Sequence, residues 1–192
     1  MRMAWICAAT VSFLVSAVSI GWSHADSAHR AKGCPIMGTA DCPMTVKLGT
    51  KESAHDHLDH VNQRGDQVMG FPHSKSVHHF TLSKLGGEIR VEAIGSGDGT
   101  TVDLIRSPLK HVASDFTTGD FRMPSEIHGR VVPGTPEMNR RRSEISYRYE
   151  PLRAGGRVLI VSRDPVAIEA VHEFLRFQIR DHATGDPATP RS

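Results

Sequence analysis

The stretch VHHFTLSKLGGEIRVEA, from Val77 to Ala93, decides the fold. Its first residues have the β-branched and aromatic composition of a strand, and Gly86-Gly87 supplies a tight turn. In the returning half, Ile89, Val91 and Ala93 alternate with charged residues, as in a strand with one buried face. Apolar side chains then recur at helical spacing: Val102, Ile105, Leu109, Val112 and Phe116. The segment therefore predicts a ββα unit.

The same arrangement returns later in the chain. Ile145–Tyr149 and Arg157–Val161 read as strands on either side of Gly155-Gly156. Asp164-Pro165 is typical of a helix start, because it combines a capping side chain with a proline tolerated in the first turn. We therefore predict an α+β fold with two ββα units, about 77–116 and 144–182, an antiparallel sheet and helices packed on one face.

The positions of the prolines modify the predicted helices. Pro108 lies within the first stripe, where a proline lacks the backbone donor and clashes with the preceding turn, so we expect a kink or a restart after Ser107. The segment Thr117–Pro136 reads as loop. Glu137–Ser143 reads as a short helix, with Pro136 in its first turn.

The chain begins with a segment of export type. Residues 1–22 are apolar with Arg2 as the only charge, and Ser23-His24-Ala25 offers small residues for cleavage. This predicts a signal peptide over 1–25 and a periplasmic or secreted protein, with an uncleaved membrane anchor as the alternative. Beyond it we expect a flexible arm over 26–67, a domain over 68–187 and a disordered tail over 188–192. No second membrane span follows.

The composition argues against a nucleic-acid-binding protein and shows an unusually high histidine content. The 192 residues include 12 histidines, and the formal net charge is only +2, without the basic surplus of a typical nucleic-acid-binding protein. Histidine is the strongest compositional deviation. It directs attention to transition metals, because neutral imidazole is a common metal ligand.

Sulfur donors gather near the predicted mature start, in CPIMGTADCPM. Cys34, Met37, Cys42 and Met44 are soft ligands of the kind that selects Cu(I). In an oxidising compartment Cys34 and Cys42 could instead form a disulfide. A third possibility is that the two cysteines neither bind a metal nor form a disulfide.

The arm also contains clustered histidines. In KESAHDHLDHVNQRGDQ a helix would place His57 and His60 on one face, whereas an extended chain would align His55 and His57. Either arrangement could hold a divalent metal weakly. The alternative is a solvated polar segment.

The folded domain has its own candidate metal donors: His78, His79, His111, His128, His172 and Met138. His78 and His79 are adjacent on a predicted strand, so their side chains point to opposite faces. One of them could converge with His172, and with His111 or His128, beneath the helices. The alternative is that each histidine is a packed or surface residue with its nitrogens satisfied.

Recognisable catalytic patterns are missing from the sequence. It has no Gly-x-Ser-x-Gly elbow, phosphate-binding loop, dinucleotide fingerprint or His-Glu-x-x-His pair. Whether the protein is an enzyme therefore stays undecided.

Three stretches together resemble a known family. They are Met69-Gly70-Phe71 with His78-His79-Phe80 after six intervening residues, the Ile127–Met138 segment, and FLRFQIRDHATGD from Phe174 to Asp186. They are similar to a family of small exported bacterial proteins of unknown activity. Some members are labelled aspartate carbamoyltransferase. The residues here do not support that label, because the phosphate-binding loop is absent and the chain is too short for two transferase domains. The family pattern implies an uninterrupted helix at Ser107-Pro108.

Three functions follow as hypotheses. The first is an exported protein that binds a transition metal, copper being favoured, through His, Met and Cys donors. The second is an enzyme or small-ligand-binding protein with His79, His128 and His172 lining a cleft between the two ββα units. The third is a structural module that binds a partner. The sequence does not indicate an oligomeric state.

Overall fold

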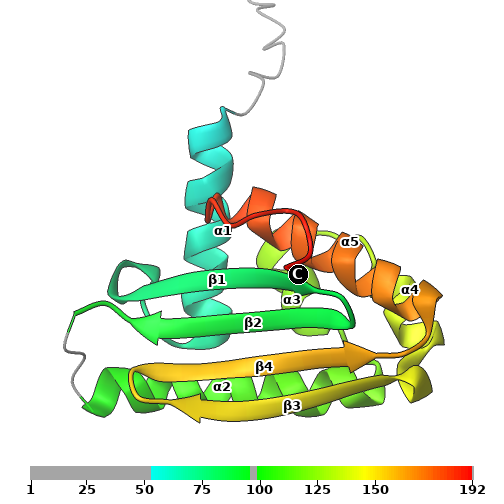
Figure 1. Cartoon of the computed structure of the whole chain (residues 1–192). Helices are drawn as coiled ribbons and strands as arrows, with labels where there is room; N and C mark the ends of the chain where they lie inside the picture. Colours follow the sequence, from blue (N-terminus) through cyan, green and yellow to red (C-terminus); the bar gives the residue numbers. More distant parts are fainter. Residues whose placement is uncertain (1–52, 96–98, 192) are drawn as a thin grey trace, which may run out of the picture. The chain divides into compact units, whose positions relative to one another are not determined.

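Two β-hairpins form the sheet. In the computed structural model, which describes residues 53–95 and 99–191, the first hairpin is β1 (Ser76–Ser83) with β2 (Gly86–Ala93). The second is β3 (Ile145–Leu152) with β4 (Gly155–Ser162). The hairpins join through β2 and β4, so the strand order is β1-β2-β4-β3 and every neighbouring pair is antiparallel (Figure 1).

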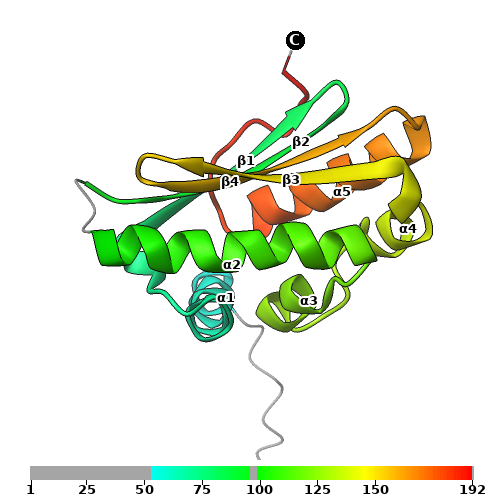
Figure 2. The same cartoon turned by 90° about the horizontal axis from the view of Figure 1, so that it is seen from below.

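A long helix follows each hairpin, and both lie on the same face of the sheet (Figure 2). These helices are α2 (Gly99–Thr118) and α5 (Pro165–Asp181). Each packs mainly beneath the hairpin of the other unit, because α2 contacts β3 and β4 whereas α5 contacts β1 and β2. The predicted α+β class, the duplicated ββα unit and the one-sided helical layer are confirmed.

The second glycine of each Gly-Gly pair, at the start of β2 and of β4, lets a helix approach the sheet. A Cβ added to Gly87 would lie 2.4 Å from Leu175 Cδ1 and 2.2 Å from the Thr81 carbonyl oxygen. A Cβ added to Gly156 would lie 3.2 Å from Leu109 Cδ1. The turns themselves are Lys84-Leu85 and Arg153-Ala154, so the Gly-Gly pairs follow the turns instead of forming them. Their role is to allow close packing of the helices on the strands.

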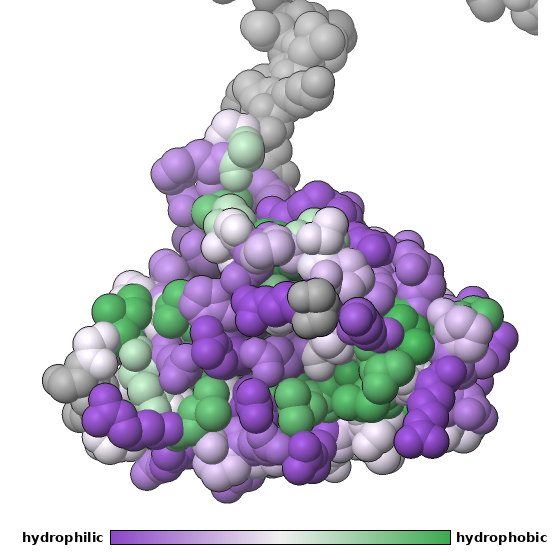
Figure 3. Space-filling model, viewed as in Figure 1, coloured by the Kyte–Doolittle hydropathy of each residue, from purple (hydrophilic) through white to green (hydrophobic). Residues whose placement is uncertain are grey.

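The opposite face of the sheet shows the alternation predicted from the sequence. On that face the Arg157 guanidinium lies 2.7 Å from Glu150 Oε2 and 3.2 Å from Glu88 Oε2. Val161, further along β4 on the same face, is 43% exposed. Figure 3 shows the resulting mixture of hydrophilic and hydrophobic side chains over the strands.

The helix α2 runs without interruption through Pro108, so the predicted restart after Ser107 is wrong. Its whole predicted stripe is buried, and Pro108 is itself buried. Packing on both sides of the proline therefore holds the helix together despite the missing hydrogen bond.

The predicted loop 117–136 contains a helix that the sequence analysis missed. This helix is α3 (Arg122–His128), and Pro124 lies in its first turn, where a proline costs no hydrogen bond. The predicted short helix is present as α4 (Thr135–Arg140), with Pro136 at its start. Single 3₁₀ turns occupy His73–Lys75 and Arg142–Glu144.

The last part of the predicted arm is a helix. The structure has α1 (Ala54–Met69) where the sequence analysis placed flexible chain up to residue 67. Its start is fixed by a capping box, in which the Ser53 hydroxyl accepts from the Asp56 N–H and the Asp56 carboxylate accepts from the Ser53 N–H. Val61 is its only buried residue, so its apolar periodicity is weak and the segment resembles loop.

The chain after α5 is also ordered further than predicted. The Asp186 carboxylate accepts the Phe80 N–H at 2.9 Å, and the Arg191 N–H donates to the Leu82 carbonyl at 3.0 Å. Residues 188–191 therefore lie along β1 instead of fraying, with Ser83 and Arg191 forming a parallel bridge.

Several predictions concern residues that the structure does not describe. The signal segment 1–25 lies outside the described residues, as does the sulfur cluster Cys34, Met37, Cys42 and Met44. Within the described ranges, no helix is both long enough and apolar enough to cross a membrane.

Candidate functional site

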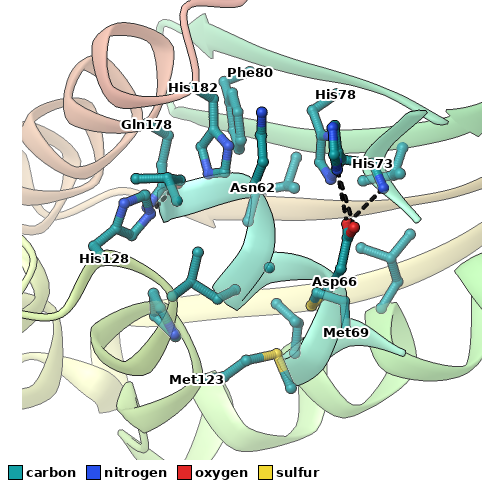
Figure 4. Close-up of a pocket in the computed structure, with 18 of the residues that line it drawn as sticks. Asn62, Asp66, Met69, His73, His78, Phe80, Met123, His128, Gln178 and His182 are labelled. Atoms are coloured by element: carbon teal, nitrogen blue, oxygen red, sulfur yellow. Dashed lines mark hydrogen bonds and ion pairs between the residues drawn. The ribbon is translucent and has the colours of Figure 1, made fainter. Parts of the chain in front are cut away.

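A pocket opens beneath β1 and β2, in the helical layer. We call it the histidine pocket, and its cavity is about 80 Å³. Figure 4 shows the side chains that define it: Asn62, Asp66 and Met69 of α1, His78 and Phe80 of β1, Met123 and His128 of α3, Gln178 of α5 and His182. Core residues of β2, α2 and α5 complete an otherwise largely apolar wall.

Two imidazoles of the pocket have no hydrogen-bond partner within the described residues. The rings of His78 and His182 are stacked, with centroids 5.6 Å apart and planes inclined by 12°. The Phe80 ring lies 5.5 Å from His182 and 6.5 Å from His78. These neighbours fix the ring positions while leaving the nitrogens available to a ligand.

Both imidazoles are neutral at neutral pH. Burial, reinforced by the charge of neighbouring histidines, lowers the pKa of His78 to about 4 and the pKa of His182 to about 3. A neutral imidazole carries one N–H donor and one acceptor nitrogen. Each ring therefore offers the pocket one donor and one acceptor.

The third imidazole, His128, has a polar side chain beside each of its nitrogens. Its Nδ1 donates to Asp181 Oδ2 at 2.5 Å, and its Nε2 lies 3.0 Å from Gln178 Oε1. Burial lowers the pKa of His128, and the Asp181 carboxylate offsets only part of that effect. His128 thus forms a fixed part of the pocket wall. Its ring is in edge-to-face contact with the ring of His182, with the ring centroids 5.0 Å apart.

The Asp181 carboxylate also ties α1 to the rest of the fold. His57 Nε2 donates to Asp181 Oδ1 at 2.9 Å, and Arg130 Nη2 lies 3.7 Å from the same oxygen. Burial opposes ionisation of Asp181, but the hydrogen bonds from His57 and His128 outweigh it and lower the pKa. The carboxylate therefore stays ionised between its partners.

Two further polar contacts position α1 over the pocket. The Arg64 Nε–H donates to the Ile127 carbonyl at 2.6 Å. The Asp66 carboxylate accepts the His73 N–H at 2.6 Å and lies 3.0 Å from His73 Nδ1 (Figure 4). α1 thus closes one side of the pocket through polar contacts, with little buried apolar surface.

The structure separates most of the predicted metal donors of the domain. His78 and His128 line the pocket, as expected of residues beneath the helices. His79 is on the other face of β1, where Nδ1 lies 3.0 Å from Asp186 Oδ1. His172 is buried, and its Nε2–H donates to the carbonyls of Ser83 and Gly86 at 2.9 and 3.1 Å. The predicted set His79, His128 and His172 is therefore not brought together.

The remaining predicted donors lie outside the pocket. His111 is exposed on α2, and Met138 is fully buried in the core. On α1, His55 and His60 are exposed, and His55 Nδ1 lies 3.1 Å from Asp59 Oδ2. Across residues 53–95 and 99–191, no group of three or more His, Cys, Asp or Glu side chains is placed to hold a metal ion.

Five polar residues that line the pocket were not among the predicted donors: Asn62, Asp66, His73, Gln178 and His182. One signal could have found two of them. Leu175 and Ile179 belong to the predicted stripe of α5, and continuing that stripe by helical spacing reaches Gln178 and His182. Asn62 had no such signal, because its segment was predicted to lie outside the domain.

Comparisons with known proteins did not identify a relative of this chain. No protein-family model, curated protein or solved structure matches the chain.

Proposed function

We propose that this protein binds a small ligand in the histidine pocket. The observation that carries the proposal is the pair of neutral imidazoles, His78 and His182, which face a largely apolar cavity without partners among the described residues. Small-molecule sites commonly combine an apolar lining with a few polar groups that orient the ligand. The pocket has this composition.

The same histidines fit binding better than acid–base catalysis. A general base works best when its pKa lies near the working pH. The pKa values of about 4 for His78 and about 3 for His182 make both rings weak bases at neutral pH. They are suited instead to accept and donate hydrogen bonds without changing charge.

Gly65 provides a direct test of the pocket. It lies on the pocket side of α1, and a Cβ added there would meet no atom within 4 Å. Gly65→Leu should therefore extend a side chain into the cavity without disturbing the helix. Gln67→Leu, at an exposed position of the same helix, is the matched control.

The measurement is a titration of the full chain with 1-propanol, 2-butanone and propionamide, followed by ¹H–¹⁵N NMR. We expect at least one probe to shift the resonances of His78 and His182 in the unmodified chain and in Gln67→Leu. Gly65→Leu should weaken that binding by at least about tenfold, the loss of roughly 1.4 kcal/mol. Undiminished binding by Gly65→Leu, or no shift with any probe, would contradict the proposal.

We propose transition-metal binding by the N-terminal segment as a second function. It is supported by the sulfur cluster Cys34, Met37, Cys42 and Met44, a donor set that favours Cu(I). The export signal predicted at the start of the chain belongs to the same proposal, because it would place this segment outside the cytoplasm.

Calorimetry with a competing chelator tests this second function. Cu(I), Cu(II) and Zn(II) are titrated into the full chain and into a Cys34→Ser, Cys42→Ser double variant. We expect Cu(I) to bind tightest and the double variant to lose that preference. Affinity no higher than that of an ordinary histidine-rich peptide would refute metal binding and leave the pocket proposal unaffected.

A further inference from the structure

A third polar side chain without a partner faces the histidine pocket. Asn62 of α1 is half-buried and lines the cavity, and its amide makes no hydrogen bond within the described residues. Figure 4 shows it reaching toward the wall that carries His78 and His182. Three elements, α1, β1 and the residue after α5, thus each supply one free polar group to the same space.

These three groups share one chemical property. The Asn62 amide and the neutral rings of His78 and His182 can each donate and accept a hydrogen bond, and none of them is charged. A polar group removed from water and left unpaired costs about 1–3 kcal/mol. A ligand that pairs with such groups therefore has to present both donors and acceptors.

The charge of the pocket lining does not favour an anionic ligand. Asp66 is the only carboxylate among the lining residues. That carboxylate already accepts from the His73 backbone and lies beside the His73 ring. Its negative charge opposes carboxylates and phosphates, and no lysine or arginine lines the cavity to offset it.

The cavity also limits the size of the ligand. Its volume of about 80 Å³ is roughly half that of an engineered cavity of about 150 Å³ that holds benzene. Met69 and Met123 contribute flexible apolar wall that can adapt to a short alkyl group. The ligand, or the part of it that enters, has only a few non-hydrogen atoms.

We propose that the histidine pocket selects small uncharged molecules with a hydrogen-bond donor and an acceptor on neighbouring atoms, primary carboxamides being the simplest such class. This inference rests on the proposed binding function and names its ligand chemistry. Asn62 is the residue that sets the preference, because a carboxamide can pair with the Asn62 amide through both donor and acceptor.

Three probes of equal size separate the relevant properties. Propionamide has a donor and an acceptor, 2-butanone has the acceptor alone, and propionate has the same shape with a negative charge. Titrations of the full chain followed by ¹H–¹⁵N NMR should give a dissociation constant for propionamide at least about fivefold below that of 2-butanone. Propionate should bind at least about tenfold more weakly than propionamide.

Asn62→Leu removes the amide while keeping a similar shape. It should reduce the preference for propionamide over 2-butanone to less than about twofold. Asn62→Ala is the second variant, because it introduces no bulk that could impair folding. Gln63→Leu removes the same group from an exposed position of α1 and should keep the full preference.

The outcomes separate this inference from the proposed function. If the three probes bind equally and Gly65→Leu blocks them all, the ligand class is wrong and the binding function stands. A preference for propionamide that survives both Asn62 variants would also overturn the inference. If none of the probes binds, the proposed function fails together with the ligand class.

Discussion

Acidification should destabilise this fold through the two neutral imidazoles of the pocket. In the folded protein the pKa of His78 is about 4 and that of His182 about 3, whereas in an unfolded chain a histidine has a pKa of about 6.5. Between these values the unfolded chain binds more protons than the folded one. Stability is therefore full above about pH 6.5 and is lost as the pH falls toward the folded-state pKa values.

The magnitude follows from the shifts. At pH 5 the unfolded-state pKa lies about 1.5 units above the pH, which corresponds to about 2 kcal/mol for each histidine. His78 and His182 are only partly shielded from solvent, so we expect about 2–3 kcal/mol for the pair between pH 7.5 and pH 5. The lowered pKa of His128 acts in the same direction.

The buried carboxylates contribute little to the change in the free energy of unfolding between pH 7.5 and pH 5. Burial opposes the ionisation of Asp181 and Asp186, but their hydrogen bonds outweigh it and lower both pKa values. Their contribution is lost only as the pH falls below the unfolded-state value of about 4. Above pH 5 the change in stability therefore reports mainly on the histidines.

Urea denaturation followed by far-UV circular dichroism measures the effect. Circular dichroism is a suitable probe because it follows the loss of the helices and of the sheet directly. His78→Gln should remove about half of the pH dependence, and His111→Gln, at an exposed position of α2, should leave it unchanged. The reasoning is refuted if stability changes by less than about 0.5 kcal/mol between pH 7.5 and pH 5, or if His78→Gln keeps the full dependence.

Three substitutions test the packing around the site by the same denaturation assay. Gly65→Ala should raise the free energy of unfolding by about 1 kcal/mol, because the added Cβ meets no atom within 4 Å and alanine favours the helix; an unchanged midpoint would contradict this. Gly134→Ala should lower it by about 3 kcal/mol or more, since its φ is +82° and a Cβ would lie 2.2 Å from the Ala170 carbonyl oxygen. Asp186→Ala should cost about 2 kcal/mol and speed exchange of the Phe80 amide hydrogen, which donates to that carboxylate. Protection of the Phe80 amide equal to the unmodified chain would show that the tail does not hold β1.

The sheet could be predicted from the sequence because local sequence signals mark where each hairpin begins, turns and ends. Gly86-Gly87 and Gly155-Gly156 directly follow the two turns, and the period-two alternation of apolar and charged residues in the strands fixes which face is buried. α3 could not be predicted, because its seven residues are too few to show a helical period. The uninterrupted α2 depends on burial around Pro108, which only the tertiary structure reveals.

The site was harder to predict because its residues come from separate segments. His78 and His79 are equivalent in the sequence, and only the side of β1 on which the helices pack decides that His78 enters the pocket and His79 meets Asp186. His172 was predicted to be a metal ligand on α5, yet its Nε2–H donates to the carbonyls of Ser83 and Gly86 at the β1–β2 turn. The local sequence does not indicate on which side of β1 the helices pack, nor that the two backbone carbonyls lie within reach of His172.

The helix α1 is what turns the space beneath β1 and β2 into a site. α2 and α5 each pack mainly under the hairpin of the other unit, and α1 with α3 covers the region left beside them (Figure 2). Val61 is the only fully buried residue of α1, and burying one such side chain contributes roughly 1.5–3 kcal/mol. Met69 is partly buried against the core. The polar contacts of His57 and Arg64 act together with these apolar contacts to fix where α1 lies. It follows that the histidine-rich character of this segment, which first suggests metal capture, serves at His57 to hold the pocket closed against Asp181.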